Sequence, residues 1–182
     1  MQSRFMSITV ILALCIGAAV AALLVFASTR PDTFSVKRTL RIDAPPERLL
    51  PLINDLRQFN RWNPFDKKDP AIRGSYRGPA SGVGAGYDFE GNKQAGKGSL
   101  QIVGADPRKV AMTLAMVEPF KVHNTIEFLL MPQGQATDVT WAMHGSSPFV
   151  AKLVGVFMNM DRMVGRDFEA GLADLKALAE RG

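Results

Sequence analysis

The feature that most restricts this chain is a stretch of 23 residues without a charge, from Phe5 to Ala27, in which most positions are Ala, Leu, Ile or Val. As a helix it would be roughly 34 Å long, enough to cross a hydrocarbon core of about 30 Å. A buried helix of a soluble domain usually carries a polar stripe, which this segment lacks. The sequence therefore predicts a membrane anchor over residues 1–30 and a single domain over residues 31–182.

A cleaved signal peptide is the main alternative for this segment. Its apolar region is normally about 7–15 residues, shorter than the one here, although Val25 and Ala27 resemble a small-residue cleavage site. A lipoprotein signal needs a small residue before its cysteine, whereas Leu14 precedes Cys15. The expectation is an uncleaved anchor that crosses the membrane once.

The side of the membrane that the domain occupies stays open. Arg4 precedes the segment, and the basic residues Arg30, Lys37, Arg38, Arg41 and Arg48 follow it. The positive-inside rule would place the domain in the cytoplasm, but folded domains can be translocated despite such charges. Cys15 is the only cysteine, so the domain can form no internal disulfide that would indicate the redox state of its compartment. Because Pro31 ends the apolar segment and the linker is short, the domain should lie close to the bilayer.

The formal net charge is +5, from 22 basic and 17 acidic residues. Attraction to anionic headgroups and a simple solvated surface both fit this excess. No segment interleaves aromatic and basic residues as base recognition requires, so no nucleic-acid partner is expected.

Alternating apolar residues separated by turn residues predict seven strands in the domain. They are Phe34–Ile42, Ile72–Tyr76, Gly86–Gly91, Gly98–Ala105, Lys109–Val117, His123–Met131 and Thr137–His144. Two short helices, Arg48–Asn54 and Leu56–Trp62, are expected after the first strand. The gaps between the later strands are short enough for hairpins, which favours an antiparallel sheet.

The last segment has the period of a long helix, from Pro148 to Glu180. Its apolar stripe comprises Leu153, Phe157, Met160, Val164, Phe168, Leu172, Leu175 and Ala179. Only this helix is large enough to cover one face of the sheet, so the expected class is α+β. A curved sheet around a helix seldom closes completely, and an apolar ligand can lodge in the gap.

Several motifs resemble those of a known family. They are Ile42-Asp43-Ala44-Pro45-Pro46-Glu47, Trp62-Asn63-Pro64-Phe65, Ser81-Gly82-Val83-Gly84-Ala85, Thr137-Asp138-Val139-Thr140-Trp141 and the segment from Gly165 to Lys176. On these residues the chain, from about Phe34 to Leu178, resembles the polyketide cyclase/dehydrase and lipid-transport family of the START-like (SRPBCC) superfamily. The resemblance implies a helix-grip fold, with a curved antiparallel sheet of about seven strands around the C-terminal helix and a hydrophobic cavity between them. That family includes both binding proteins and enzymes.

No catalytic or metal-binding constellation is recognisable. The only histidines, His123 and His144, belong to no short-spaced ligand set, and strand alternation turns both away from the core. The glycine-rich segments 82–86 and 91–98 lead into strands rather than helices, so no nucleotide cofactor is expected. Neither a catalytic residue nor a cofactor or metal is therefore assigned.

Four carboxylates are candidates for acid–base chemistry. Asp88 and Glu90 alternate with Tyr87 and Phe89, and the two aromatics are expected inside, which leaves the acids in solvent. The other two, Glu118 and Asp161, are placed where a side chain could reach the mouth of a cavity.

Aromatic and methionine side chains give the expected ligand-binding set, which is Trp62, Phe65, Tyr76, Tyr87, Phe89, Trp141, Phe157 and Met160. Each of them could equally fill the core. As a set they predict an adaptable apolar pocket, in which Tyr and Trp bring polar tips.

The leading hypothesis is a membrane-anchored module that binds a hydrophobic small molecule, such as a lipid or an isoprenoid-like compound. A cyclase or dehydratase that uses the same cavity is the first alternative. A protein-interaction domain of the Hsp90-activator type is the second.

Overall fold

The computed structural model describes residues 2–181, and the chain forms two compact units. The first joins the N-terminal residues up to Thr33 with Ser147–Asn159, and the second joins Phe34–Ser146 with the residues from Met160 onward. Met1 and Gly182, the end residues of the two expected ranges, lie outside the described residues.

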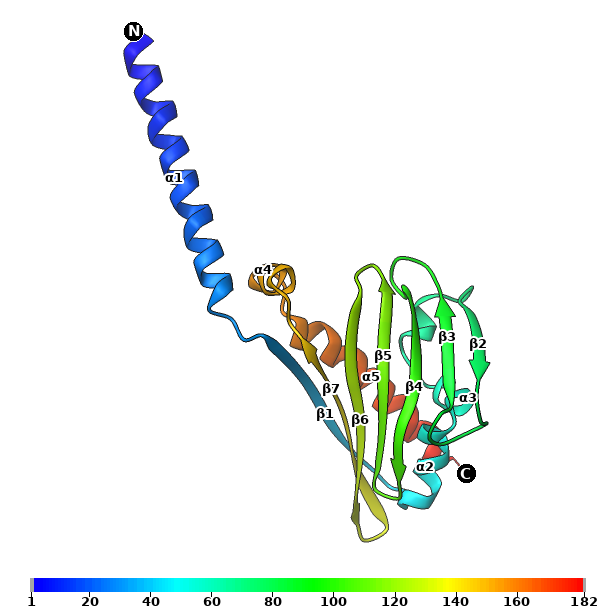
Figure 1. Cartoon of the computed structure of the whole chain (residues 1–182). Coiled ribbons are helices and arrows are strands. Elements are labelled where there is room, and N and C mark those ends of the chain that lie inside the picture. Colours follow the sequence, from blue (N-terminus) through cyan, green and yellow to red (C-terminus); the bar gives the residue numbers. More distant parts are fainter. Residues whose placement is uncertain (1, 182) are drawn as a thin grey trace. The chain divides into compact units, whose positions relative to one another are not determined.

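Within the described residues, the second unit is built on one curved sheet of seven strands (Figure 1). These are β1 (Thr33–Ile42), β2 (Arg73–Arg77), β3 (Gly86–Glu90), β4 (Lys97–Asp106), β5 (Lys109–Glu118), β6 (Val122–Gln133) and β7 (Ala136–Ser146). Their order in the sheet is β1-β7-β6-β5-β4-β3-β2. Strands β2 to β7 pair antiparallel with their chain neighbours, for example Phe128 with Trp141. The seven predicted strands are confirmed, with every end within two residues of its expected position.

Two short helices and one turn of 3₁₀ helix connect β1 to β2. Helix α2 (Pro46–Asn54) begins with proline, which is favourable in a first turn, and turns Leu49 and Ile53 into the core. Helix α3 (Leu56–Phe59) is capped by Asp55, whose Oδ1 accepts a hydrogen bond of 2.8 Å from the Arg57 amide. The 3₁₀ turn η1 covers Asp66–Lys68. Both predicted helices are confirmed, although the second ends at Phe59.

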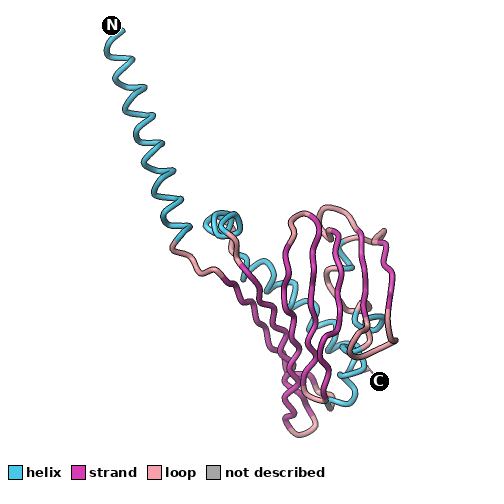
Figure 2. The backbone as a smooth tube through the Cα atoms, in the orientation of Figure 1, coloured by secondary structure: helices cyan, strands magenta, loops and turns pink. Residues whose placement is uncertain are grey.

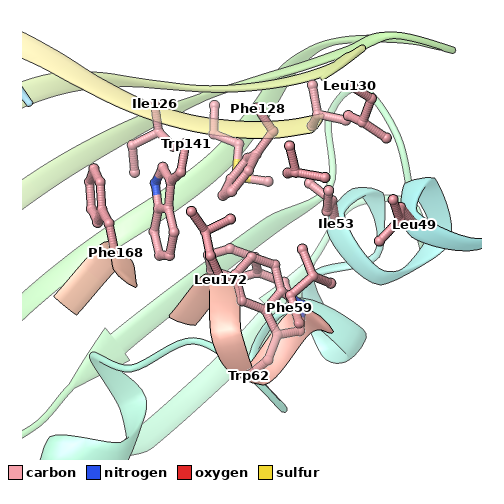
Figure 3. Close-up of a cluster of buried hydrophobic side chains, with 14 of the residues drawn as sticks. Leu49, Ile53, Phe59, Trp62, Ile126, Phe128, Leu130, Trp141, Phe168 and Leu172 are labelled. Atoms are coloured by element: carbon pink, nitrogen blue, oxygen red, sulfur yellow. The ribbon is translucent and has the colours of Figure 1, made fainter. Parts of the chain in front are cut away.

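Helix α5 (Met160–Glu180) packs on the inner face of the sheet. Its buried side chains lie at spacings of three and four, at Val164, Phe168, Leu172, Leu175 and Ala179. Figure 3 shows Phe168 beside Trp141 of β7, and the two rings stack with centroids 4.2 Å apart. This arrangement confirms the expected helix-grip fold.

Gly171 allows α5 to approach β7 closely. A Cβ atom at this position would lie 2.7 Å from Cζ3 of Trp141 and 2.9 Å from Cδ of Pro64. Both distances are too short for a real Cβ contact, so a larger residue would push the helix away from the sheet.

The prediction of one continuous helix from Pro148 to Glu180 is wrong. Helix α4 (Phe149–Phe157) ends before Met158, which is extended with φ −121° and ψ 125°, and α5 begins at Met160. The apolar spacing from Phe157 to Met160 continues across the break, so periodicity alone could not reveal it. Asn159 lies at the break, and asparagine favours caps and turns over helix interiors.

The first unit contains α1 (Gln2–Ser28) and α4, drawn as cyan helices in Figure 2. Within the described part of the chain, Ile8–Ser28 is the one segment long and apolar enough to cross a membrane. A signal sequence can meet the same criteria of length and composition. Most side chains of Ile8–Ser28 are exposed, whereas that of Ala27 is buried.

Candidate functional site

A cavity of about 300 Å³ lies inside the second unit, between the inner face of the sheet and α5. Its apolar lining comes from the strands (Phe89, Leu100, Leu114, Met116, Ile126, Trp141 and Met143), from α5 (Met160, Val164 and Phe168) and from the connecting segments (Phe59, Phe65, Ile72 and Ala95). Because side chains alternate along a strand, every second residue of β6 and β7 faces this cavity or the adjacent core. The site is therefore a direct product of the apolar alternation in the sequence.

Aromatic contacts fix one wall of the cavity. The ring of Phe65 meets Trp141 edge-on, with centroids 6.4 Å apart. Nζ of Lys68 lies 4.7 Å from the centroid of Phe65 and also pairs with Oδ2 of Asp167 at 2.7 Å. The ion pair to α5 and the cation–π contact together hold Phe65 against the cavity.

A half-buried carboxyl group, that of Asp66, is among the polar groups that line the apolar cavity. Oδ2 of Asp66 accepts a hydrogen bond of 3.1 Å from the Tyr87 hydroxyl, and Oδ1 accepts one of 3.1 Å from Nδ2 of Asn63. Burial raises the pKa of Asp66, while the hydrogen bonds from Tyr87 and Asn63 act in the opposite direction. Burial, followed by the nearby charge of Asp66, also raises the pKa of Tyr87.

Two further polar atoms among the lining residues have no hydrogen-bond partner in the described structure. They are Oδ1 of Asn124 on β6 and Nε1 of Trp141 on β7. A buried polar group without a partner costs about 1–3 kcal/mol, so such groups are normally satisfied. Both residues line the cavity, so they are the candidates for polar contacts with a molecule bound there.

Five of the eight side chains expected to bind a ligand line this cavity, namely Phe65, Tyr87, Phe89, Trp141 and Met160. Trp62 is instead fully buried in the core beside Trp141, and its Nε1 donates to the Leu52 carbonyl at 2.8 Å. Tyr76, on β2, is 36% exposed. Phe157 belongs to the first unit and is 76% exposed. A ligand-binding role for these eight residues stays a prediction.

The acidic and histidine residues considered from the sequence lie elsewhere. Asp88 and Glu90 face outward and pair with Arg77 and Arg73, respectively. Asp161 forms an ion pair with Arg38 at 3.1 Å, which lowers the pKa of this carboxyl group. Glu118, His123 and His144 are exposed, as alternation predicted for the two histidines. Among residues 2–181, no group of three potential ligand side chains could hold a metal ion.

Sequence reasoning missed the polar residues of the cavity: Asn63, Asp66, Gln94 and Asn124. Asp66 directly follows the motif Trp62-Asn63-Pro64-Phe65, and this position beside a family motif is the signal in the sequence that could have identified it. Its inward orientation depends on the η1 turn, whose three residues have no periodicity to analyse.

Comparisons with known proteins agree with this fold. The family model described as "Polyketide cyclase / dehydrase and lipid transport" matches residues 33–180. No curated protein matches the chain.

Solved structures with the same fold come from bacteria and plants. Protein MLL2253 from Mesorhizobium loti is 14% identical with a TM-score of 0.60, over 81% of this chain and 98% of that one. Ginseng major latex-like protein 151 from Panax ginseng is 11% identical with a TM-score of 0.60, over 82% and 99%. The Aha1 dimer from Colwellia psychrerythraea is 18% identical with a TM-score of 0.51, over 79% and 93%. By the extent of the family match, the chain belongs to the polyketide cyclase/dehydrase and lipid-transport family.

Proposed function

We propose that the chain is a membrane-anchored module that binds a hydrophobic small molecule in the cavity between sheet and α5. Membership of the family suggests a ligand-binding domain, and the cavity carries the proposal. Protein interiors normally contain few voids larger than a water molecule. A void of about 300 Å³ is twice the roughly 150 Å³ of an apolar cavity that stays dry and binds benzene.

The lining also suggests the chemistry of the ligand. Ligand pockets are mostly apolar and contain a few polar groups that fix orientation. Nε1 of Trp141 would donate to an oxygen of the ligand, and Oδ1 of Asn124 would accept from a hydroxyl or amide. The proposed ligand is therefore a largely hydrocarbon molecule with at least one hydroxyl or carbonyl group.

The anchor is the second part of the proposal. Residues 1–30 would hold the domain of residues 31–182 at a membrane, with α1 as the span. An apolar ligand partitions into the bilayer, so a nearby binding site would receive it from a concentrated source. The exposed apolar surface of Ile8–Ser28 supports this proposal.

Photoaffinity labelling in lipid nanodiscs tests where such a ligand binds. A fatty alcohol with a diazirine group should label segments that line the cavity, such as Leu114–Met116 and Met160–Phe168. Excess unlabelled alcohol should prevent this labelling, whereas a hydrocarbon of equal length should compete less well. In the Asn124→Leu variant, the unlabelled alcohol and the hydrocarbon should prevent labelling to a more similar extent. Labelling confined to α1 would contradict the proposal.

An enzyme is the second candidate, and Asp66 is the observation that favours it. A carboxyl group with a raised pKa in an apolar cavity is suited to acid–base catalysis. In a dehydration, Asp66 would protonate a leaving hydroxyl as the C–O bond breaks. Its carboxylate would then take a proton from the adjacent carbon, which forms the C=C bond and releases water.

Asp66→Asn separates the two candidates. The amide keeps the size of the side chain and removes its proton chemistry. If the chain only binds, the wild type and the variant should retain compounds of the same mass. If the chain is a dehydratase, the variant should retain a substrate that is heavier by one water molecule.

A further inference from the structure

Helix α4 turns its apolar side chains outward. Phe149, Val150, Val154 and Phe157 are between 42% and 76% exposed. Their positions along the helix put Val150, Val154 and Phe157 on one side. The sequence of the helix, FVAKLVGVF, contains no polar residue apart from one lysine.

That lysine, Lys152, lies on the opposite side of the helix. Its side chain is 8% exposed, and Nζ pairs with Oδ1 of Asp32 at 2.5 Å. A helix on a water-exposed surface normally has the reverse arrangement, with its charge outside and its apolar residues inside. The orientation of α4 is favourable where the medium outside it is itself apolar.

Helix α4 is held at the end of α1 within the same unit. The two helices pack against each other, and Ala27 near the end of α1 is buried. Nη2 of Arg30 donates to the Gly155 carbonyl at 3.1 Å, which satisfies one of the open carbonyls in the last turn of α4. The Ser147 amide donates to the Asp32 carbonyl at 2.6 Å. These bonds join α4 to the residues that follow the proposed span.

We infer that α4 is an interfacial helix whose outward apolar face binds the lipid surface, an inference that rests on the proposed membrane anchor. If α1 crosses the bilayer, its last residues lie at the membrane surface, and α4 is fixed there. Apolar faces of such helices enter the boundary between headgroups and acyl chains by about 5–10 Å. Arg30 can keep its charge at headgroup level above Phe26, whose ring centroid is 5.5 Å away.

Three labelled proteins, all full-length and reconstituted in phosphatidylcholine vesicles, test this inference. The first carries an environment-sensitive fluorophore on the native Cys15 in α1. The other two carry it in a Cys15→Ala background, on Val150→Cys or Val83→Cys. Val150 and Val83 are matched, since both are valines and they are 62% and 60% exposed. Nitroxide-bearing lipids report contact with the bilayer, and iodide reports contact with water.

The probe at position 150 should lose more than about half of its emission to nitroxide lipids and be shielded from iodide. The probe at position 83 should show the opposite. Quenching of the 150 probe by iodide would overturn the inference. Shielding from both quenchers would also overturn it, because it would indicate a second copy of the chain. The Cys15 probe tests the anchor separately: if lipid quenches it but not the 150 probe, the anchor stands and the interfacial helix does not.

Discussion

The Tyr87 hydroxyl donates a hydrogen bond of 3.1 Å to Oδ2 of Asp66 inside the cavity of the second unit. The two residues are 21 positions apart, in β3 and in the η1 turn. Their bond places a carboxyl group of raised pKa against walls that are otherwise mostly apolar. This polar group distinguishes the cavity from a packing defect lined by apolar atoms alone, and the enzymatic proposal depends on it.

Replacing Tyr87 by Phe should raise the pKa of Asp66 further. The hydrogen bond from Tyr87 favours the ionised carboxylate, so its loss favours the protonated form. Carboxyl-carbon NMR titration of the wild type and Tyr87→Phe measures both pKa values. A lower pKa of Asp66 in the variant would contradict the described geometry. The lost hydrogen bond should also cost about 1 kcal/mol of stability.

Asp66→Asn should change how stability depends on pH. Because burial raises the folded-state pKa of Asp66, ionisation costs stability as the pH rises from the unfolded pKa through the folded pKa. This cost is absent below the unfolded pKa and stays in place above the folded one. Over a pH range that begins below the ordinary carboxyl pKa of about 4, the variant should therefore gain stability relative to the wild type as the pH rises, measured by urea unfolding. A constant difference across this range would argue against a buried carboxyl group.

Phe168→Ala should destabilise the second unit by about 3–5 kcal/mol, because Phe168 is 1% exposed and stacks on Trp141. Phe120→Ala is the matched control, since Phe120 is 70% exposed and should change stability by less than about 0.5 kcal/mol. Urea unfolding in detergent measures both. Equal effects of the two variants would show that α5 does not grip the sheet as described.

Gly171→Ala should cost about 1–3 kcal/mol, because the added Cβ would lie 2.7 Å from the Trp141 ring. Gly104→Ala in β4 is the control, since its Cβ would lie at an ordinary 3.5 Å from Cβ of Ala111. The control should be neutral or slightly stabilising. Thermal unfolding of both variants checks this. A neutral Gly171→Ala would mean that helix and sheet are farther apart.

The anchor can be tested with charges in its centre. Ile16→Lys combined with Val20→Lys should cost about 2.5–3.5 kcal/mol per lysine in membrane insertion. The wild-type chain should remain with membranes during alkaline carbonate extraction, and the double variant should be released. Val103→Lys, on an exposed position of β4, should behave as the wild type. Release of the wild-type chain would contradict membrane anchoring.

The sequence was most informative where one period persisted over several turns or strands. Alternation in β6 and β7 predicted which side chains of the sheet point inward, including Trp141. The spacing from Val164 to Ala179 predicted the buried face of α5. These features depend on local backbone geometry, which a short window of sequence records.

Other features depend on contacts between segments that are far apart in the sequence, and no periodic pattern of residues predicts such contacts. The break at Met158 keeps the apolar spacing intact, so the two helices read as one. Trp62 and Trp141 look alike in the sequence, yet only Trp141 lines the cavity, while Trp62 fills the core beneath it. Asp66 enters the cavity because η1 directs it toward Tyr87 on β3.

The most direct test of the central proposal is native mass spectrometry of the full-length chain released from detergent, combined with two matched valine variants. Val164→Trp should fill the cavity, because Val164 is 8% exposed and part of its lining. Val103→Trp places the same side chain on an exposed position of β4. The wild type and Val103→Trp should each retain one apolar compound per chain, and Val164→Trp should retain none. A wild-type chain without any bound compound, or equal occupancy in all three proteins, would contradict the proposal that this cavity binds a hydrophobic ligand.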